Sequence, residues 1–466
     1  MPMTDHPASL SLANIEPFSC PAVMIASPAS GQGKTTFTAA LARLYRNKGL
    51  SVKVFKCGPD FLDPMIHEQA CGNPVDVVDT WMTTDDYTRF MLAEAAACHD
   101  VLIVEAAMGL FDGDSSPAAL ARQLGLPIWT VINARAMAQS FGALAYGLKH
   151  YQPDTPLAGV IAGQVGGDYH VELLRESLPE DIPLVGAIPR DSAMVLPERH
   201  LGLVQASELA TTLDQQLDNA AALLESRGFG ALPPDVTFTL PECDSVEPLL
   251  NGCRIAIARD DAFAFIYAAN LRTLKALGAE LQIFSPVAGD RLPECDAVWL
   301  PGGYPELHMT ALAENCALVA DLEAHVAAGR QLYAECGGML YLLESLTDQH
   351  GATGMMAGLL PGSATLQERL VNLGLEALDL PEGELRGHSF HYSTMTTPMT
   401  PWQHTRRQRA RYGSDTGEAV YRKGSIQASY HHAYFASAPH AAATLFMASD
   451  LTKPMKHALD QASETV

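Results

Sequence analysis

The sequence of 466 residues lacks several features that would restrict its class at once. It contains no run of eighteen or more apolar residues, so a membrane-spanning helix is not expected. The first twenty residues have neither a basic region nor a continuous apolar segment, which argues against secretion. The nine cysteines include no C-x-x-C pair, so neither a disulfide framework nor a zinc knuckle is indicated. We therefore expect a soluble, globular protein of the reducing cytoplasm.

Basic residues are also scarce. Thirty Lys and Arg stand against 53 Asp and Glu, which gives a formal net charge of -23. Such a charge repels a phosphate backbone, whereas proteins that bind nucleic acids carry a basic face or stripe. DNA and RNA are therefore not expected as partners. Any anionic ligand must be held by a local cluster of cations, metal ions and backbone N–H groups.

The length exceeds that of one ordinary core, so two domains are expected. From residue 21 to about residue 213, short apolar runs alternate with segments of helix length, which predicts a parallel sheet covered by helices. Strands are expected at 22–26, 52–55, 101–104, 128–132, 157–162 and 184–188, and a helix at 34–48. A second α/β series begins near residue 252, with strands expected at 255–258, 281–284, 297–300 and 332–334.

The strongest local motif is the segment 30–36, SGQGKTT, which follows the first predicted strand and opens the first predicted helix. Its glycines let backbone N–H groups face phosphates, and the helix N-terminus adds positive potential. Lys34 would reach the terminal phosphates of ATP, and the hydroxyl of Thr35 would face Mg²⁺. Pro28 stands where the usual Walker A loop has its first glycine. The predicted nucleotide-binding residues are Gly31, Gly33, Lys34, Thr35 and Thr36.

Four carboxylates follow predicted strands of the first domain: Asp60, Asp63, Glu105 and Asp112. Ligands of open α/β sheets bind at the carboxyl ends of the strands. An acidic residue that leaves a buried strand toward a P-loop is typical of a Mg²⁺ ligand or a water-positioning group. We expect all four to bind substrate or phosphate, and Thr35, Glu105 and Asp60 to bind the metal. For any one of them the alternative is a helix cap or a solvated loop charge.

The second predicted domain contains a candidate nucleophile, Cys336. It lies between a predicted strand and a helix in the segment 332–340, LYAECGGML, which resembles a nucleophile elbow. The helix N-terminus would favour the thiolate, and the N–H of Gly337 can stabilise an oxyanion. Gly302 and Gly303 follow another predicted strand and are candidates for the second oxyanion donor. The alternative for Cys336 is a buried structural cysteine.

A thiol nucleophile needs a general base, and His432 is the candidate, with His431 as its competitor. A third member of a catalytic triad is not evident. Class I glutaminases usually present His-x-Glu, and the corresponding position here is Tyr434. Cys336 and His432 therefore act as a dyad, or another group orients the imidazole.

A P-loop domain followed by a Cys-His glutaminase domain resembles the cobyrinate and hydrogenobyrinate a,c-diamide synthase family over residues 22–446. The motifs that carry the resemblance lie at 27–36, 56–64, 79–82, 108–113, 136–140, 301–306, 335–338 and 387–393. The resemblance implies a ligase of cobalamin biosynthesis that amidates the a and c carboxylates of a corrinoid through acyl phosphates, using ATP, Mg²⁺ and glutamine. It also implies a cytoplasmic enzyme, with a homodimer as the assembly considered and with neither membrane nor nucleic acid as partner.

The expected architecture is α/β in two domains. An extension at 1–20 precedes a doubly wound P-loop amidoligase domain at 21–224, and a Pro-rich linker at 225–251 leads to a class I glutaminase-like domain at 252–448 and a tail at 449–466. Gly163 and Asn133 depart from the family pattern around the nucleotide, which leaves nucleotide selectivity open.

Three other readings stay open. One is a related tetrapyrrole enzyme, such as cobyric acid synthase or the diamide synthase that acts on nickel sirohydrochlorin. Another is a non-catalytic P-loop switch protein, which glutaminase activity would exclude. The third, suggested by the missing triad member, is a synthetase that has lost glutamine hydrolysis and keeps ammonia-dependent synthesis.

Overall fold

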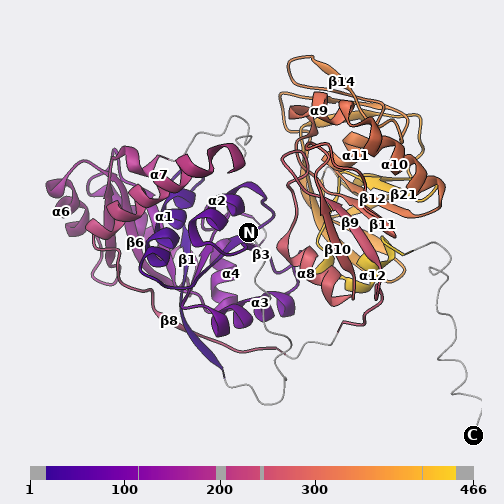
Figure 1. The fold of residues 1–466 in the computed structure, drawn as a ribbon. Coiled ribbons are helices and arrows are strands. Elements are labelled where there is room, and N and C mark those ends of the chain that lie inside the picture. Colours follow the sequence, from indigo (N-terminus) through magenta and orange to yellow (C-terminus); the bar gives the residue numbers. More distant parts are fainter. Residues whose placement is uncertain (1–16, 114, 196–205, 242–245, 412, 448–466) are drawn as a thin grey trace, which may run out of the picture. The chain divides into compact units, whose positions relative to one another are not determined.

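The computed structural model describes residues 17–113, 115–195, 206–241, 246–411 and 413–447, so the predicted tail at 449–466 lies outside the described residues. The chain divides into two compact units, residues 1–245 and 246–466. Each unit contains a sheet with helices packed on it, and the predicted α/β class is confirmed (Figure 1).

The first unit is built on a parallel sheet with the strand order β3-β2-β4-β1-β5-β6-β7. Its strands are β1 (Phe18–Ala26), β2 (Val52–Cys57), β3 (Asp76–Val78), β4 (Val101–Glu105), β5 (Ile128–Asn133), β6 (Leu157–Val165) and β7 (Leu184–Pro189). All six strands predicted for this unit are present. The sequence did not indicate β3, which has only three residues, nor β8 (Asp235–Phe238), which pairs antiparallel with the start of β1 inside the segment predicted as a linker.

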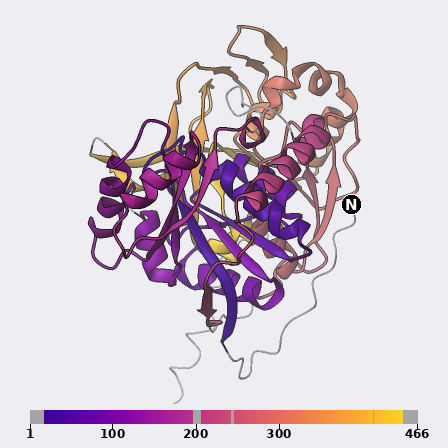
Figure 2. The same cartoon turned by 90° about the vertical axis from the view of Figure 1, so that its left-hand side faces the viewer.

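Helices cover both faces of this sheet, as Figure 2 shows. They are α1 (Lys34–Asn47), α2 (Leu62–Cys71), α3 (Asp85–Cys98), α4 (Pro117–Leu124), α5 (Ser140–His150), α6 (Asp168–Glu176) and α7 (Ala206–Ser226), with the short 3-10 helix η1 (Ser192–Met194). Successive residues of β1 enter different cores, because side chains alternate across a strand. Met24 packs in the core that includes α3, α4 and α5, and Ile25 packs in the core that includes α1, α2 and α7. Burial on both faces explains the almost continuous apolar runs of the central strands.

The second unit contains a ten-stranded sheet with the order β10-β9-β11-β12-β21-β20-β19-β16-β17-β22. The parallel part consists of β9 (Arg254–Ala258), β10 (Glu280–Phe284), β11 (Ala297–Leu300), β12 (Gln331–Glu335) and β21 (Ile426–Ser429). The antiparallel part consists of β20 (Ser414–Lys423), β19 (Gln403–Arg411), β16 (Asn372–Leu380), β17 (Gly383–His391) and β22 (His432–Ala433). The four predicted strands all lie in the parallel part. The antiparallel part was not predicted, because strands such as β19, QHTRRQRAR, have no buried apolar run.

A second, small sheet and five helices complete this unit. The sheet contains β13 (Ser345–Thr347), β14 (Thr353–Met355), β15 (Ser363–Leu366) and β18 (Ser393–Thr396). The helices are α8 (Ala268–Ala276), α9 (Met309–Glu314), α10 (Cys316–Ala327), α11 (Gly337–Leu342) and α12 (Pro439–Thr444), with the 3-10 helices η2 (Pro305–Leu307) and η3 (Phe435–Ser437). Two cores lie on opposite faces of the large sheet, since Ala256 and Ile257, neighbours on β9, belong to different ones.

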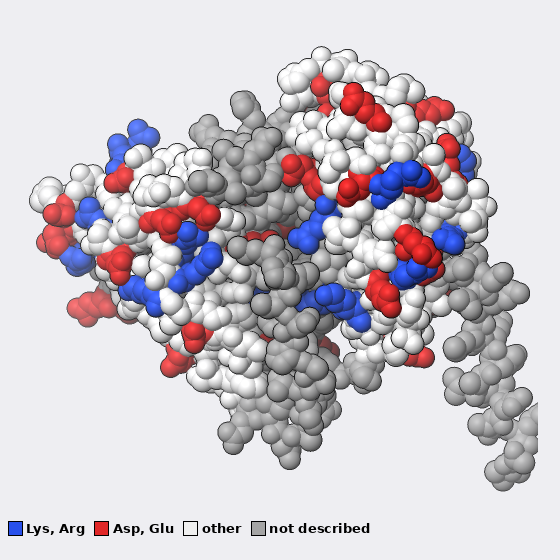
Figure 3. Space-filling model, in the orientation of Figure 1, with Lys and Arg blue, Asp and Glu red and all other residues white. Residues whose placement is uncertain are grey.

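The described surface mixes charges of both signs. On the face drawn in Figure 3, Lys and Arg side chains are interspersed with Asp and Glu, without a continuous basic stripe. Arg291, for example, pairs with Asp321, and Arg254 pairs with Asp296. In the described part of the chain, none of the helices has both the length and the apolarity needed to cross a bilayer.

Two glycines of α5 provide a matched test of the packing. A Cβ at Gly142 would overlap the carbonyl oxygen of Ser177, whereas a Cβ at Gly147 would meet nothing within 4 Å. We expect Gly147→Ala to stabilise the protein by about 0.5 to 1 kcal/mol, because alanine favours a helix. We expect Gly142→Ala to destabilise it by roughly 1 to 3 kcal/mol through overpacking. Denaturant unfolding of both variants checks the pair, and an equal effect of the two substitutions would contradict the packing described.

Candidate functional site

The P-loop of the first unit joins β1 to α1. Gly31 and Gly33 adopt φ values of 75° and 91°, a region that side chains with a Cβ rarely enter, so the loop requires glycine at both places. The Lys34 ammonium is folded back onto the protein, donating to Ser27 Oγ at 2.8 Å and to the carbonyl oxygen of Met108 at 2.7 Å. Burial lowers the pKa of Lys34, and the nearby carboxylate of Glu105 opposes that shift. The loop thus holds a cation beside exposed backbone N–H groups, as phosphate binding requires.

Glu105, the last residue of β4, is the centre of a buried polar cluster. Thr35 Oγ1 donates to Glu105 Oε1 at 2.8 Å and lies 3.3 Å from Asp63 Oδ2. Lys56 faces Glu105 in the register of β2 and β4, and its ammonium donates to Glu105 at 2.9 Å and to Asp63 at 2.6 Å. His67 Nε2, from α2, contacts the other carboxylate oxygen of Glu105. Four segments of the chain therefore meet at one carboxylate.

Mutual compensation keeps this cluster ionised. Burial would raise the pKa of Glu105, but Lys56 and His67 outweigh it and hold that pKa below its usual range. Burial would lower the pKa of Lys56, but Glu105, Asp63 and Asp60 together raise it. The carboxylate and the ammonium therefore both stay charged near neutral pH. Removing either partner would leave an uncompensated buried charge.

The other predicted acidic residues are placed differently. Asp60 Oδ1 accepts from the N–H groups of Leu62 and Asp63 at 2.8 and 3.3 Å, at the start of α2, and its other oxygen lies 3.6 Å from Lys56. Asp112 accepts from the N–H of Gly109 at 3.0 Å within its own loop. Asp63, rather than Asp60, is thus the carboxylate that meets Thr35 together with Glu105.

Two members of the cluster, Lys56 and His67, were not predicted as site residues. A signal for each was available. Lys56 is a charged residue in a strand that is buried along its whole length. His67 follows Asp63 by four residues in α2, which places both on the same helical face.

The donors around Thr35 fit a magnesium ion. A hydroxyl and two carboxylates supply the oxygen ligands that Mg²⁺ prefers, and Mg²⁺ usually takes only one or two carboxylates along with water and substrate phosphates. Among the described residues, no group of three or more His, Cys, Asp and Glu side chains forms a metal-binding set.

Cys336 of the second unit lies at a sharp turn between β12 and α11. Its φ of 42° and ψ of -107° are strained for a residue with a side chain, as in a nucleophile elbow. Its N–H donates to the carbonyl oxygen of Ser429 at 2.8 Å, which fixes the turn against β21. A Cβ at Gly337 would lie 2.8 Å from the Gly303 nitrogen, so the elbow and the Pro-Gly-Gly turn after β11 are in close contact. The two segments predicted to form the oxyanion site are thus packed against each other.

His432 lies on β22, where it pairs with His388 of β17. The two imidazole rings stack with their centroids 5.0 Å apart and their planes 16° apart. A Cβ at Gly302 would collide with the imidazole of His432, so glycine is needed there for the ring to occupy this place. The structure thus brings the base candidate against the predicted oxyanion turn.

Burial disfavours the charged form of both the thiol and the imidazole. Burial, with the Glu306 carboxylate adding to it, raises the pKa of Cys336, and burial lowers the pKa of His432 well below its usual value. Both groups are therefore neutral near pH 7 in the free protein. A neutral imidazole can accept the thiol proton when a substrate arrives, which is what a general base must do.

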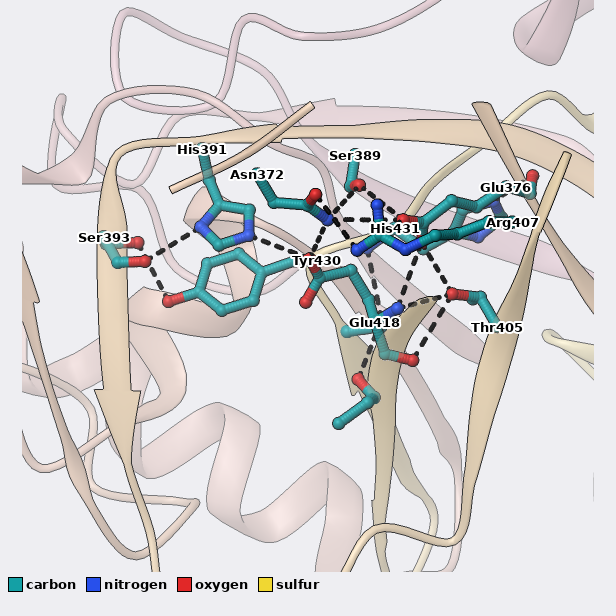
Figure 4. A network of polar contacts seen from close by, with 12 residues as sticks. Asn372, Glu376, Ser389, His391, Ser393, Thr405, Arg407, Glu418, Tyr430 and His431 are labelled. Carbon is teal, nitrogen blue, oxygen red and sulfur yellow. Dashed lines mark hydrogen bonds and ion pairs between the residues drawn. The ribbon is translucent and has the colours of Figure 1, made fainter. Parts of the chain in front are cut away.

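A buried polar network, shown in Figure 4, adjoins the base. His431 Nε2 lies 3.2 Å from the carbonyl oxygen of Glu376, and the Glu376 carboxylate accepts from Thr405 Oγ1 at 2.6 Å. The ring of His391 stacks on Tyr430 at 3.7 Å. The network also contains Asn372, Ser389, Ser393, Arg407 and Glu418. It anchors the segment just before His432, and it engages His431, which favours His432 as the base.

Tyr434, which stands where glutaminases usually have a glutamate, is fully buried and packs edge-on against Tyr267 with their centroids 5.3 Å apart. Its ring is part of the aromatic packing beneath the site.

The fold and the two sites define a P-loop nucleotide-binding domain joined in one chain to a glutamine amidotransferase domain. The model of the CobQ/CobB/MinD/ParA nucleotide binding domain matches residues 23–204, and that of the CobB/CobQ-like glutamine amidotransferase domain matches residues 254–440. The class is thus that of a glutamine-dependent, nucleotide-using ligase.

Curated relatives show to which family of such ligases the chain belongs. The protein named hydrogenobyrinate a,c-diamide synthase from Stutzerimonas stutzeri is 55% identical to this chain, and the match covers 91% of this chain and 98% of the relative. The protein of the same name from Pseudomonas aeruginosa is 52% identical, and the match covers 91% of this chain and 97% of the relative. The cobyrinate a,c-diamide synthase of Herminiimonas arsenicoxydans is 45% identical over 91% of this chain and 96% of its own length. The chain belongs to the cobyrinate and hydrogenobyrinate a,c-diamide synthase family.

The buried state of Cys336 predicts low reactivity in the free protein. Cys336 is 7% exposed and its pKa is raised by burial, whereas Cys316 is exposed. Because the thiolate is the reactive form, iodoacetamide at neutral pH should alkylate Cys316 well before Cys336. Peptide mapping by mass spectrometry over a time course measures the order. Faster labelling of Cys336 than of Cys316 would show that the thiol is open and ionised without substrate.

Proposed function

We propose that this chain converts the a and c carboxylates of hydrogenobyrinate or cobyrinate into amides, using ATP and glutamine. The observation that carries the proposal is the presence, in one chain, of a P-loop with a buried ionised carboxylate cluster and of a cysteine at a strained elbow, packed on a turn that itself contacts a histidine. The names of the relatives supply the substrate class. We assign the ATP-dependent step to residues 21–224 and glutamine hydrolysis to residues 252–448.

In the first unit, a substrate carboxylate would attack the terminal phosphate of ATP to give an acyl phosphate and ADP. A carboxylate is a poor electrophile, so this activation is needed before ammonia can displace the phosphate as its leaving group. Gly31, Gly33, Lys34, Thr35 and Thr36 would bind the nucleotide, and Asp60, Asp63, Glu105 and Asp112 would hold substrate or phosphate. Mg²⁺, held through Thr35, Glu105 and Asp63 or Asp60, would neutralise phosphate charge.

In the second unit, the Cys336 thiol would attack the side-chain amide of glutamine while the neutral imidazole of His432 takes up its proton. The N–H groups of Gly337 and of the turn at Gly302 and Gly303 would stabilise the oxyanion. His432 would then return the proton to the departing nitrogen, releasing ammonia and a thioester. Water hydrolyses the thioester to glutamate. Ammonia made in this way is unprotonated, whereas free ammonia in water near pH 7 is mostly ammonium.

The proposal further includes a cytoplasmic location, a homodimer, and the absence of nucleic-acid and membrane partners. The net charge of -23 supports the exclusion of nucleic acid. Light scattering and cell fractionation test the assembly and the location.

The direct test of the function follows the mass of the macrocycle. The purified protein, with ATP, Mg²⁺, glutamine and hydrogenobyrinate or cobyrinate, should yield two successive carboxyl-to-amide conversions. Cys336→Ala should lose synthesis with glutamine and keep it with an ammonium salt, because only ammonia production needs the thiol. Hydrolysis of glutamine without amidation of either macrocycle would refute the substrate assignment and favour a nickel tetrapyrrole. Absence of glutaminase activity in the unaltered protein would refute the role of the second unit.

Two threonines of α1 test the magnesium site. Thr35 Oγ1 meets Glu105 and Asp63, whereas the buried hydroxyl of Thr38 has no hydrogen-bond partner among the described residues. We expect Thr35→Val to weaken the apparent affinity for Mg²⁺ in ATP binding at least about tenfold, by analogy with losses at metal-site groups. Thr38→Val should leave it unchanged. Calorimetric titration of ATP at several Mg²⁺ concentrations measures both, and equal behaviour of the variants would argue against Thr35 as a ligand.

A further inference from the structure

Glu335, the residue before Cys336, is a buried carboxyl group with two defined partners. It ends β12 and is 2% exposed. Its Oε1 accepts from the hydroxyl of Tyr333 at 2.9 Å and from the backbone N–H of Ala433 at 3.0 Å. Ala433 directly follows His432. A side chain adjacent to the nucleophile thus binds the backbone adjacent to the base, across a separation of 98 residues in the chain.

The strand that carries the base is short. β22 has two residues, and its strand partner is β17. The polar groups of Ala433 are engaged by side chains: its N–H donates to Glu335, and its carbonyl oxygen accepts from Asn270 Nδ2 at 2.8 Å. Asn270 Oδ1 also accepts from the N–H of Phe435 at 2.8 Å. Because Asn270 lies on α8 and Glu335 on β12, the two hold the same peptide segment from different elements.

Of these two side chains, Glu335 couples the segment to the nucleophile. Its backbone continues directly into the strained elbow at Cys336, whose N–H is itself bound to Ser429 of β21. Any shift of the Ala433 peptide relative to the elbow would break the Glu335 contact. Such a shift would remove the Ala433 donor from a buried carboxyl oxygen, and losing a buried hydrogen bond costs free energy. The contact therefore resists the shift.

We propose that Glu335 is a positioning residue that sets the separation of the Cys336 thiol and the His432 imidazole by holding the backbone that follows the base. The inference rests on the proposed glutaminase function of the second unit.

The protonation state of Glu335 suits this role. Burial raises its pKa to about 8, although the hydrogen bonds from Ala433 and Tyr333 oppose the shift. The side chain is therefore largely neutral near pH 7 and places no negative charge beside the thiol that must ionise. A glutamine, which is neutral and retains Oε1 as an acceptor, is consequently the close mimic of Glu335, and alanine is the variant without the acceptor.

The test compares Glu335→Gln with Glu335→Ala. A matched control is Asn315→Ala, which also removes a buried polar side chain of this unit, one that bonds to Pro286, Asp290 and Leu318 instead of to the site. For each full-length variant, kcat and KM of glutamine hydrolysis, ammonia-dependent synthesis and the melting temperature are measured. We expect Glu335→Ala to lose roughly tenfold to a hundredfold in glutaminase kcat, as misplacement of reacting groups does, with little change in KM.

Glu335→Gln should retain most of the glutaminase kcat. Both Glu335 variants should keep ammonia-dependent synthesis. The control Asn315→Ala should lower the melting temperature without lowering the glutaminase kcat. Unchanged kcat in Glu335→Ala would overturn the inference while leaving the proposed function intact. Equal loss in Glu335→Gln and Glu335→Ala, at unaltered melting temperature, would also overturn it, since the acceptor would then not be the active feature. Absence of glutaminase activity in the unaltered protein would instead be a failure of the proposed function.

Discussion

Parallel pairing of neighbouring strands is the constraint on which both candidate sites depend. In a parallel sheet the carboxyl ends of the strands meet at one edge, so the residues that leave them converge. In the first unit, Glu105 stands between Ile25 of β1 and Lys56 of β2 in the sheet. This register places Lys56 and Glu105 next to the strand that leads into the P-loop. In the second unit, Glu335 stands opposite Ser429, which brings the elbow beside the segment that leads to the base. Each site is therefore a consequence of register.

The buried carboxyl groups of the two sites differ in charge, because only one of them has cationic neighbours. Glu105 is fully buried but remains ionised, because Lys56 and His67 lie against it. Glu335 is equally buried but has only neutral donors, and its pKa is raised to about 8. The first site thus contains a buried carboxylate that stays charged. At the second site, burial keeps the thiol, the imidazole and the adjacent carboxyl group largely neutral near pH 7.

The imidazole of His432, the candidate base, is held in place by contacts from several elements. Stacking on His388 restricts one face of the His432 ring, and Gly302 leaves room for it beside the oxyanion turn. The peptide after His432 is held by Glu335 and Asn270, and the residues before it belong to the buried network of Figure 4. The backbone on both sides of His432 is therefore held by buried polar side chains.

The sequence by itself determined the α/β class, the P-loop, the elbow cysteine and the family, because each of these is encoded in contiguous residues: apolar runs, a glycine-rich turn or a short motif. It did not reveal β8 or the charged strands of the antiparallel part, since their burial depends on partners distant in the chain. Only the tertiary structure decided which side chains meet. Lys56, His67 and Glu335 reach their partners across 49, 38 and 98 residues. Strand register places Lys56 opposite Glu105, whereas the packing of α2 brings in His67, and β22, which carries Ala433, is paired with β17 and not with the strand of Glu335.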